Sequence, residues 1–257
     1  MSNDNLGDRM KEYEKVETGR KFMPCLPIYA RIDGHSFSNF TRGMERPYDA
    51  VMSSIMEDVT KYLVKETGAS TGYTQSDEIP LCWPMEDYYS DVMFAGKIQK
   101  MVSTLAALAT AKFVELALKA FPERCAKRLP TFDARVFQLP NNTELANAFL
   151  WRVQDAVKNS IQMTAQHYFD HAELQGKNQK AQLELLESKG VVWGNYPRFF
   201  KEGTFVKREL FWKTGLHGQL GCERTRVVAL DMAMPFGEHP DKEEFLTLRT
   251  IGHLNND

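Results

Sequence analysis

The chain has 257 residues, of which 43% are hydrophobic and 26% are charged, so it is long enough and apolar enough to bury a core of its own. The 34 acidic residues outnumber the 32 basic ones, and the formal net charge of -2 excludes a protein that attracts nucleic acid through its overall charge. The four cysteines lack C-x-x-C spacing, which argues against a zinc site or a disulfide framework and favours a reduced, cytoplasmic protein.

The predicted elements of the first half follow the order strand, helix, strand, strand, helix, strand. Hydrophobic runs and apolar spacings predict strands over 27–32, 69–74, 79–83 and 131–137, and helices over about 49–67 and 95–121. Charges within the second helix favour a core helix over a membrane span. The order is typical of an α+β, ferredoxin-like antiparallel sheet with its helices on one face, which polymerase palms also use.

The rest of the chain is predicted to be a C-terminal extension. Apolar residues at helical spacing predict a third helix over about 144–169, and short strand-like pieces follow at 191–193 and 204–208. No linker rich in Pro, Ser or Gly divides the chain. We therefore expect residues 1–140 to form a palm-like catalytic core and residues 141–257 to pack on it, as one structural unit.

Two short acidic motifs each follow a predicted strand. Asp33 lies in Arg31-Ile32-Asp33-Gly34, and Asp77 and Glu78 lie in Gln75-Ser76-Asp77-Glu78. Two carboxylates at strand ends could share magnesium ions, which would hold a nucleoside triphosphate in line with its attacking oxygen. The motifs thus indicate phosphoryl or nucleotidyl transfer. Alternatively, each Asp could simply cap its own turn, and Glu78 could either support the metal ligands or face solvent.

The motifs resemble those of the tRNA-His guanylyltransferases and the related guanylyltransferase-like proteins, which add nucleotides to RNA 5′ ends in the 3′-to-5′ direction. The likeness covers roughly residues 25–210. It rests on the two acidic motifs and on two later ones, Phe132-Asp133-Ala134-Arg135-Val136 and Trp151-Arg152-x-x-Asp155. Members dedicated to tRNA-His carry His-Ile-Asn-Asn just after the last motif, where this chain has Val157-Lys158-Asn159-Ser160. The missing histidine favours the guanylyltransferase-like branch, which resembles a template-directed repair polymerase of tRNA 5′ ends.

The resemblance implies a magnesium-dependent nucleotidyltransferase that adds nucleotides, chiefly G, to the 5′ end of tRNA after activation by ATP or GTP. It implies two magnesium ions bound by Asp33, the carbonyl of Gly34 and Asp77, with Asp33, Asp77 and Glu78 as the catalytic acids. The nucleotide-binding residues that it suggests are Arg31, Gly34, His35, Ser36, Phe37, Ser76, Lys97 and Lys100. The residues that it suggests for RNA binding or activation are Arg135, Arg152, Asp155 and Asn159.

Several of these assignments have structural alternatives. Lys97 and Lys100 match a family Phe-x-x-Arg-x-x-Lys pattern at the start of the second helix and are expected to bind the triphosphate, but they could be a solvated face. Arg152 and Asp155 could form only an intrahelical ion pair. The ring of Phe37 could stack on a base, although we favour an anchor in the core.

Three other functions remain open at this point. Within the family, the chain could be a dedicated enzyme that adds one non-templated G to tRNA-His. Outside it, the chain could be an inactive RNA-binding protein, or a palm-type cyclase that needs no RNA. We expect tRNA and nucleoside triphosphates as partners, no membrane, and a homotetramer.

Overall fold

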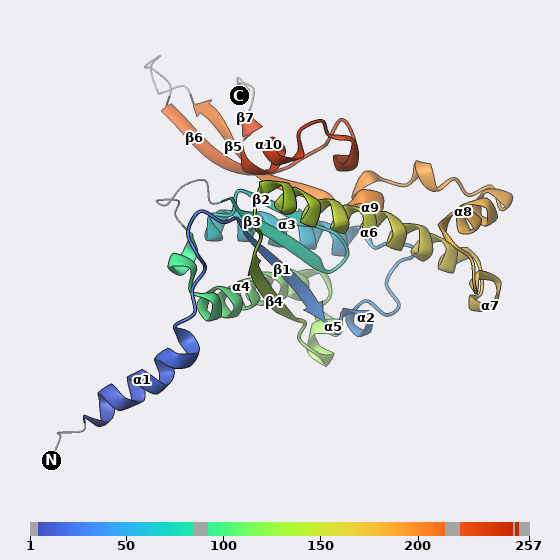
Figure 1. Ribbon diagram of the computed structural model, residues 1–257. Coiled ribbons are helices and arrows are strands. Elements are labelled where there is room, and N and C mark those ends of the chain that lie inside the picture. The colour runs from blue at the N-terminus through green and yellow to red at the C-terminus, as the bar shows by residue number, and fades with distance from the viewer. Residues whose placement is uncertain (1–4, 85–91, 214–221, 249, 252–257) are drawn as a thin grey trace.

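The computed structural model describes residues 5–84, 92–213, 222–248 and 250–251. A single sheet runs through the molecule in the strand order β4-β1-β3-β2-β5-β6, with antiparallel neighbours throughout, and β7 pairs in parallel with β5 (Figure 1). The strands are β1 (Ile28–His35), β2 (Thr71–Thr74), β3 (Glu78–Trp83), β4 (Thr131–Gln138), β5 (Thr204–Lys213), β6 (Cys222–Ala229) and β7 (Thr250–Ile251). The order β4-β1-β3-β2 is that of a ferredoxin-like sheet, so the predicted palm core is confirmed.

Two long helices, α3 (Ala50–Thr67) and α4 (Ile98–Ala120), cover one face of this sheet. The α3 helix begins where the Asp49 carboxylate accepts a 2.9 Å hydrogen bond from the Met52 N–H, and it ends at Gly68, whose φ of 73° is unstrained only for glycine. By length and composition α4 could cross a membrane. Its buried stripe, which includes Leu105 and Phe113, packs within the core, so α4 is a core helix as expected.

The opposite face of the sheet is covered by α6 (Asn142–Tyr168), which comes from the C-terminal half of the chain. Successive side chains of β1 point to opposite faces of the sheet, and both faces carry apolar residues that helices cover. Ile28, Ala30 and Ile32 pack on the side of α3 and α4. Tyr29 points to the other side and packs with Phe149 of α6. Because β5 pairs with β2, the C-terminal half also extends the palm sheet itself.

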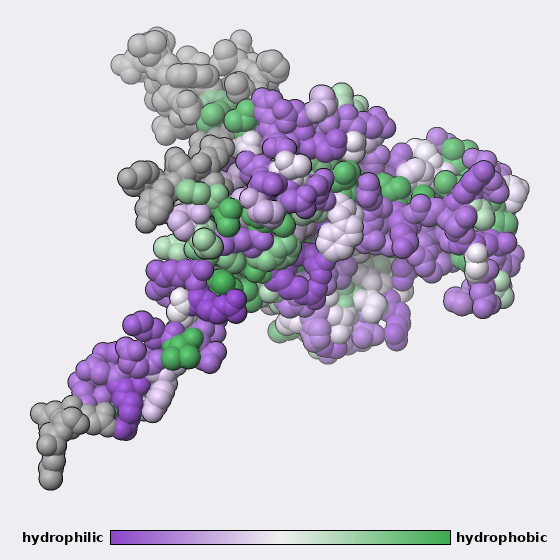
Figure 2. Space-filling view, in the orientation of Figure 1, coloured by the Kyte–Doolittle hydropathy of each residue, from purple (hydrophilic) through white to green (hydrophobic). Residues whose placement is uncertain are grey.

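Shorter helices surround this core, and the N-terminal α1 (Leu6–Thr18) projects away from it with no buried residue (Figures 1 and 2). The others are α2 (Phe37–Phe40), α5 (Pro122–Lys127), α7 (His171–Leu174), α8 (Gln179–Ser188), α9 (Arg198–Glu202), α10 (Lys242–Thr247), and the 3-10 turns η1 (Met93–Gly96), η2 (Trp193–Asn195) and η4 (Phe236–Glu238).

The C-terminal half differs from the sequence prediction, which also did not include α7, α9, β6, η4 or α10. The strand predicted at 191–193 is wrong: Val191 packs against the ends of α6 and α8, and the chain then enters the η2 turn instead of pairing. The α8 helix was not predicted, because only Leu186 of its residues is buried and its apolar period is weak. The strand predicted at 204–208 is present as β5, but it continues to Lys213 to pair with β6.

Candidate active site

The two acidic motifs lie side by side because their strands are neighbours in the sheet. Asp33 near the end of β1 is directly opposite Glu78 at the start of β3. Gln75 and Glu78 exchange two backbone hydrogen bonds, of 3.0 and 3.1 Å, which close a tight turn around Ser76 and Asp77. The Gly34 N–H then donates to the Asp77 carbonyl oxygen at 3.1 Å and ties one motif to the other.

The surroundings of Asp77 disfavour the ionised form of its carboxylate. Burial raises the pKa of Asp77, and the negative charge of Asp33 raises it further. The Ser76 hydroxyl donates a 3.1 Å hydrogen bond to Asp77 Oδ1 and works in the opposite direction, favouring the ionised form. A bound cation would therefore favour the ionised form of Asp77.

This donor set fits a hard divalent cation. Asp33 and Asp77 offer carboxylate oxygens and Gly34 a carbonyl oxygen, and magnesium takes one or two protein carboxylates with the remainder from phosphates and water. Within the described residues, no group of three or more His, Cys, Asp or Glu side chains is placed to hold a metal ion. His167 and His171 have the i, i+4 spacing of a helical zinc pair, but among the described residues they have no third ligand.

A cavity of about 510 Å³ opens beside the acidic turns and is large enough for a nucleotide. Gly34, Ser36, Ser76 and Asp77 line one part of it, and its other lining includes Arg46, Pro47, Tyr48, Asp49, Met163, Phe199 and Phe200. The Tyr48 ring packs with Phe199 and Phe200 of α9, at centroid distances of 5.2 and 4.9 Å, and these three rings form an aromatic wall.

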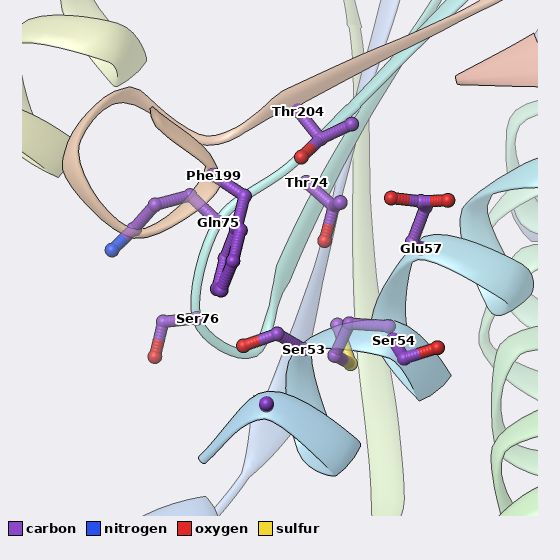
Figure 3. Close-up of a pocket in the computed structure, with 10 residues that line it drawn as sticks. Ser53, Ser54, Glu57, Thr74, Gln75, Ser76, Phe199 and Thr204 are labelled. Carbon is purple, nitrogen blue, oxygen red and sulfur yellow. The ribbon is translucent and has the colours of Figure 1, made fainter. Parts of the chain in front are cut away.

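Phe199 also borders a second, smaller hollow that adjoins the first along the Gln75–Ser76 turn. Figure 3 shows the Phe199 ring beside this turn, with Ser53, Ser54 and Glu57 projecting from α3. The aromatic wall was missed in the sequence, because nothing in residues near 199 signals that α9 returns to the palm. For Arg46, the only feature of the sequence that suggested a role in the site was its position before Pro47.

Phe37 is an anchor in the core, as favoured from the sequence, and its inclusion among the nucleotide-binding residues is corrected because its ring is buried. Its side chain is only 3% exposed, and its ring packs on Phe113 and Phe132 at 5.1 and 4.9 Å. A Cβ atom on Gly34 would lie 2.4 Å from this ring. The anchored ring therefore requires glycine at position 34, whose N–H donates to the Asp77 carbonyl oxygen.

Arg152 supports the acidic site from α6. Its Nε and Nη2 atoms donate to both oxygens of Glu78, at 2.6 and 2.8 Å, and Nη2 also donates to Asp155 at 3.1 Å. Asn159 completes the network by donating to Asp155 at 3.2 Å. The Arg152 and Glu78 side chains are only 10% and 12% exposed. Glu78 thus does not face solvent, and the prediction that Arg152 contacts RNA is corrected to a positioning role.

Other predicted cations remain accessible on the same face as Asp33. Arg31 lies 5.8 Å from the exposed Trp151 ring, and Arg135 makes a loose 3.7 Å contact with Asp133 two residues earlier on β4. His35 ends β1 and is exposed, and Ser36 follows in a left-handed conformation with φ of 59°. These residues stay candidates for contacts with phosphate.

Lys97 and Lys100 lie at the other end of the sheet. The backbone of Lys97 forms a β-bridge with Lys21, which precedes β1. The acidic end of the sheet is instead next to the middle of α4, where the Thr110 hydroxyl accepts a hydrogen bond from the Phe132 N–H. Phe132 is opposite Gly34. At 1.5 Å per helical residue, Lys97 and Lys100 are about 20 and 15 Å from that point. They instead line a hollow with Glu14 and Thr18 of α1. Within one subunit they cannot bind a triphosphate held at Asp33 and Asp77, which corrects that assignment.

Known proteins match this chain along most of its length. The family model for tRNA(His) guanylyltransferase matches residues 7–140, slightly more than half of the chain. An uncharacterised protein of Acanthamoeba polyphaga mimivirus is 31% identical over 90% of this chain and 86% of its own length. The tRNA(His) guanylyltransferase of Saccharomyces cerevisiae is 27% identical over 76% of this chain and 88% of its own length.

Solved structures agree with these matches. A bacterial tRNA(His) guanylyltransferase-like protein in complex with ATP has a TM-score of 0.81 and 32% identity, covering 95% of this chain and 100% of that one. A GTP complex of such a bacterial protein has a TM-score of 0.73 and 30% identity, with coverages of 94% and 97%. The chain therefore belongs to the tRNA(His) guanylyltransferase family of nucleotidyltransferases, as its sequence motifs predicted.

Proposed function

We propose that this protein is a magnesium-dependent nucleotidyltransferase that extends the 5′ end of tRNA in the 3′-to-5′ direction, chiefly with G, after ATP or GTP has activated that end. The observation that carries the proposal is the cavity beside the joined acidic turns, where Asp77 and Gly34 lie at one part of a nucleotide-sized space and the aromatic wall at another. The bacterial relatives solved in complex with ATP and with GTP support these two substrates.

In this proposal each part of the cavity recognises a different part of the nucleotide. Tyr48 and Phe199 offer ring faces on which a base can pack, and such stacking is tolerant of base identity. Arg46 supplies a positive charge for phosphate within the same cavity. The position of the acids then fixes where the phosphates lie.

The acids are the proposed magnesium ligands. Asp33, Asp77 and the Gly34 carbonyl would hold the ions, which when bound neutralise phosphate charge and align the attacking and leaving oxygens. Ser76 keeps the Asp77 carboxylate oriented through its hydrogen bond. Arg152 holds Glu78 ion-paired next to Asp33, so that this third acid does not add an uncompensated charge to the site.

The test is an extension assay with purified protein, magnesium, ATP and labelled GTP. The RNAs are a 5′-monophosphorylated tRNA that lacks its first nucleotide and full-length tRNA(His), each with A or C at the discriminator position. Template-matched extension of the truncated RNA supports the proposal. The Asp77→Asn variant should lose the product, while Asp58→Asn, which alters an exposed acid on α3, should retain it.

Each rival function gives a different result in the same assay. A single G added to tRNA(His) regardless of template identifies the dedicated enzyme. A product formed from GTP without any RNA identifies a cyclase. RNA binding without any product leaves a binding protein that has lost the chemistry, and would refute the proposal.

We also propose that the protein self-associates into a homotetramer. The α1 helix projects from the core and exposes large apolar side chains, including Leu6, Met10 and Tyr13. These residues follow one another at helical spacing and so share a face. A second subunit is the simplest cover for this face, and light scattering in solution measures the state directly.

A further inference from the structure

We propose that the hollow between α2 and α5 binds backbone phosphates of the RNA strand whose 5′ end is extended. This inference rests on the proposed function, because it assigns the place where that RNA approaches the acidic site. We call this space the α2–α5 hollow, and its volume is about 500 Å³. Its basic lining residues are Arg42, Arg124, Lys127 and Arg128, and its other lining includes His35, Ser36, Asn39 and Glu123.

The hollow is held in shape by Arg124. Its Nη1 atom donates to the carbonyl oxygens of Phe40 and Arg42, at 2.8 and 2.7 Å, and so fastens α5 to the loop after α2. The two short helices lie next to each other in Figure 1. Because Arg124 is engaged with backbone oxygens, its role is to build the hollow and to contribute its charge.

The charge of the hollow differs in sign from that of the whole chain. Four basic side chains and one acidic side chain, Glu123, line it, in a protein with a formal net charge of -2. Lys127 and Arg128 are exposed, and neither forms an ion pair with another residue of the described chain. Like charges gathered in a concave surface without partners repel one another and attract an anion.

The α2–α5 hollow adjoins the acidic site. His35 lies two residues after Asp33 on the same strand, and Ser36 lines both the hollow and the cavity that contains Asp77. The turn between β1 and α2 therefore separates the two spaces. With Lys97 and Lys100 at the far end of the sheet, the hollow supplies a group of cations next to the acids, in addition to Arg31, Arg46 and Arg135.

The lining favours RNA phosphates over a second nucleotide. The ring of Phe40 borders the hollow, but it is only 9% exposed and packs on Phe113 and Phe121, so it presents no face to a base. The aromatic wall that can receive a base belongs to the other cavity. Cations without a stacking surface fit a sequence-independent contact with backbone phosphates.

The experiment measures binding of a fluorescent, 5′-monophosphorylated tRNA lacking its first nucleotide, with magnesium and without ATP or GTP. The test protein carries Lys127→Ala and Arg128→Ala together, which leaves Arg124 and the fold in place. The matched control carries Lys65→Ala and Lys180→Ala, which remove the same charge from exposed sites on α3 and α8. A third protein, with Lys127→Arg and Arg128→Lys, keeps the charge.

We expect the double alanine variant to bind the RNA roughly tenfold more weakly at about 50 mM salt. The slope of log affinity against log salt concentration should become shallower by about 0.7–0.9 for each phosphate contact that is lost. The control and the charge-conserving variant should match the wild type. Unchanged affinity and slope in the alanine variant would overturn the inference. So would a raised KM for GTP with unchanged RNA binding, which would place a nucleotide in the hollow.

The binding readout separates this inference from the proposed function, because it involves no nucleotide transfer. Wild-type protein that binds RNA but yields no product would refute the proposed function and leave the hollow to be judged by its own variant. If the wild type is active and the alanine variant binds RNA as tightly as the wild type, only the inference about the hollow is refuted.

Discussion

Replacing Arg152 with methionine tests whether this residue supports the acidic site or contacts RNA. Methionine keeps much of the side-chain volume but leaves the Glu78 carboxylate without the two hydrogen bonds, of 2.6 and 2.8 Å, that hold it. Both side chains are nearly buried, at 10% and 12% exposure. Removing one partner of such a pair strands a charge in the interior and costs about 3–5 kcal/mol of folding free energy.

That cost predicts a large fall in melting temperature. For a chain of this size each kcal/mol corresponds to roughly 2–4 °C, so the Arg152→Met variant should melt about 6–20 °C lower. The matched control is Lys61→Met, which breaks a more exposed pair with Glu57 and should cost at most about 1 kcal/mol. Circular dichroism melts and urea titrations provide the two measurements.

The loss in Arg152→Met should also depend on pH. Burial already raises the pKa of Glu78, while Arg152 lowers it, so removing Arg152 raises the folded-state pKa further. An acid whose pKa is raised on folding destabilises the folded state once it is ionised. The deficit relative to wild type should therefore be smallest at acidic pH and grow as the pH rises past the wild-type pKa of Glu78, which lies above the ordinary glutamate value of about 4.3.

A double-mutant cycle with Glu78→Gln decides the interpretation. If the pair is the cause, the double variant should be more stable than the sum of the single effects predicts, by about 2 kcal/mol. A coupling below about 0.5 kcal/mol would refute the reasoning. Unchanged stability together with weakened RNA binding in Arg152→Met would restore the RNA contact that the geometry argues against.

The remaining predictions concern the acids, the glycine and the aromatic wall. Without magnesium, Asp77→Asn should melt at a higher temperature than wild type, by a margin that widens as the pH rises above about 3.9, because it removes a carboxylate that burial and Asp33 destabilise. Magnesium should stabilise the wild type and Asp58→Asn but not Asp77→Asn in the same melts, and equal stabilisation of all three would contradict the metal site. Gly34→Ala should cost at least about 1–3 kcal/mol, because its Cβ would overlap a buried ring, whereas Gly194→Ala has its nearest contact at 3.9 Å and should be tolerated. Phe199→Ala should raise the KM for GTP roughly tenfold and Phe199→Tyr should not; an unchanged KM in both would exclude this ring from the nucleotide site.

The sequence determined the palm core and the position of its acids. Apolar periodicity is a local property, so the four strands and the two long helices up to residue 138 could be predicted, and with them the placement of Asp33 and Asp77 at strand ends. The short helices α1, α2 and α5 were not predicted. The C-terminal half was harder, because α8 buries little and β5 continues only through its pairing with β6. The family followed from four motifs in order, which are specific as a set even though each is short.

Only the tertiary structure decided what the side chains around the acids do. Arg152 meets Glu78 across 74 residues of sequence, and Phe199 meets Tyr48 across a still longer stretch, so neither partner is visible in a local pattern. The direction of α4 across the sheet takes Lys97 away from the acids, while α5 brings Lys127 near them. A motif fixes which groups a chain carries; the pairing of distant segments in a packed core fixes which of them can meet, because burial and hydrogen bonding are satisfied only in the assembled fold.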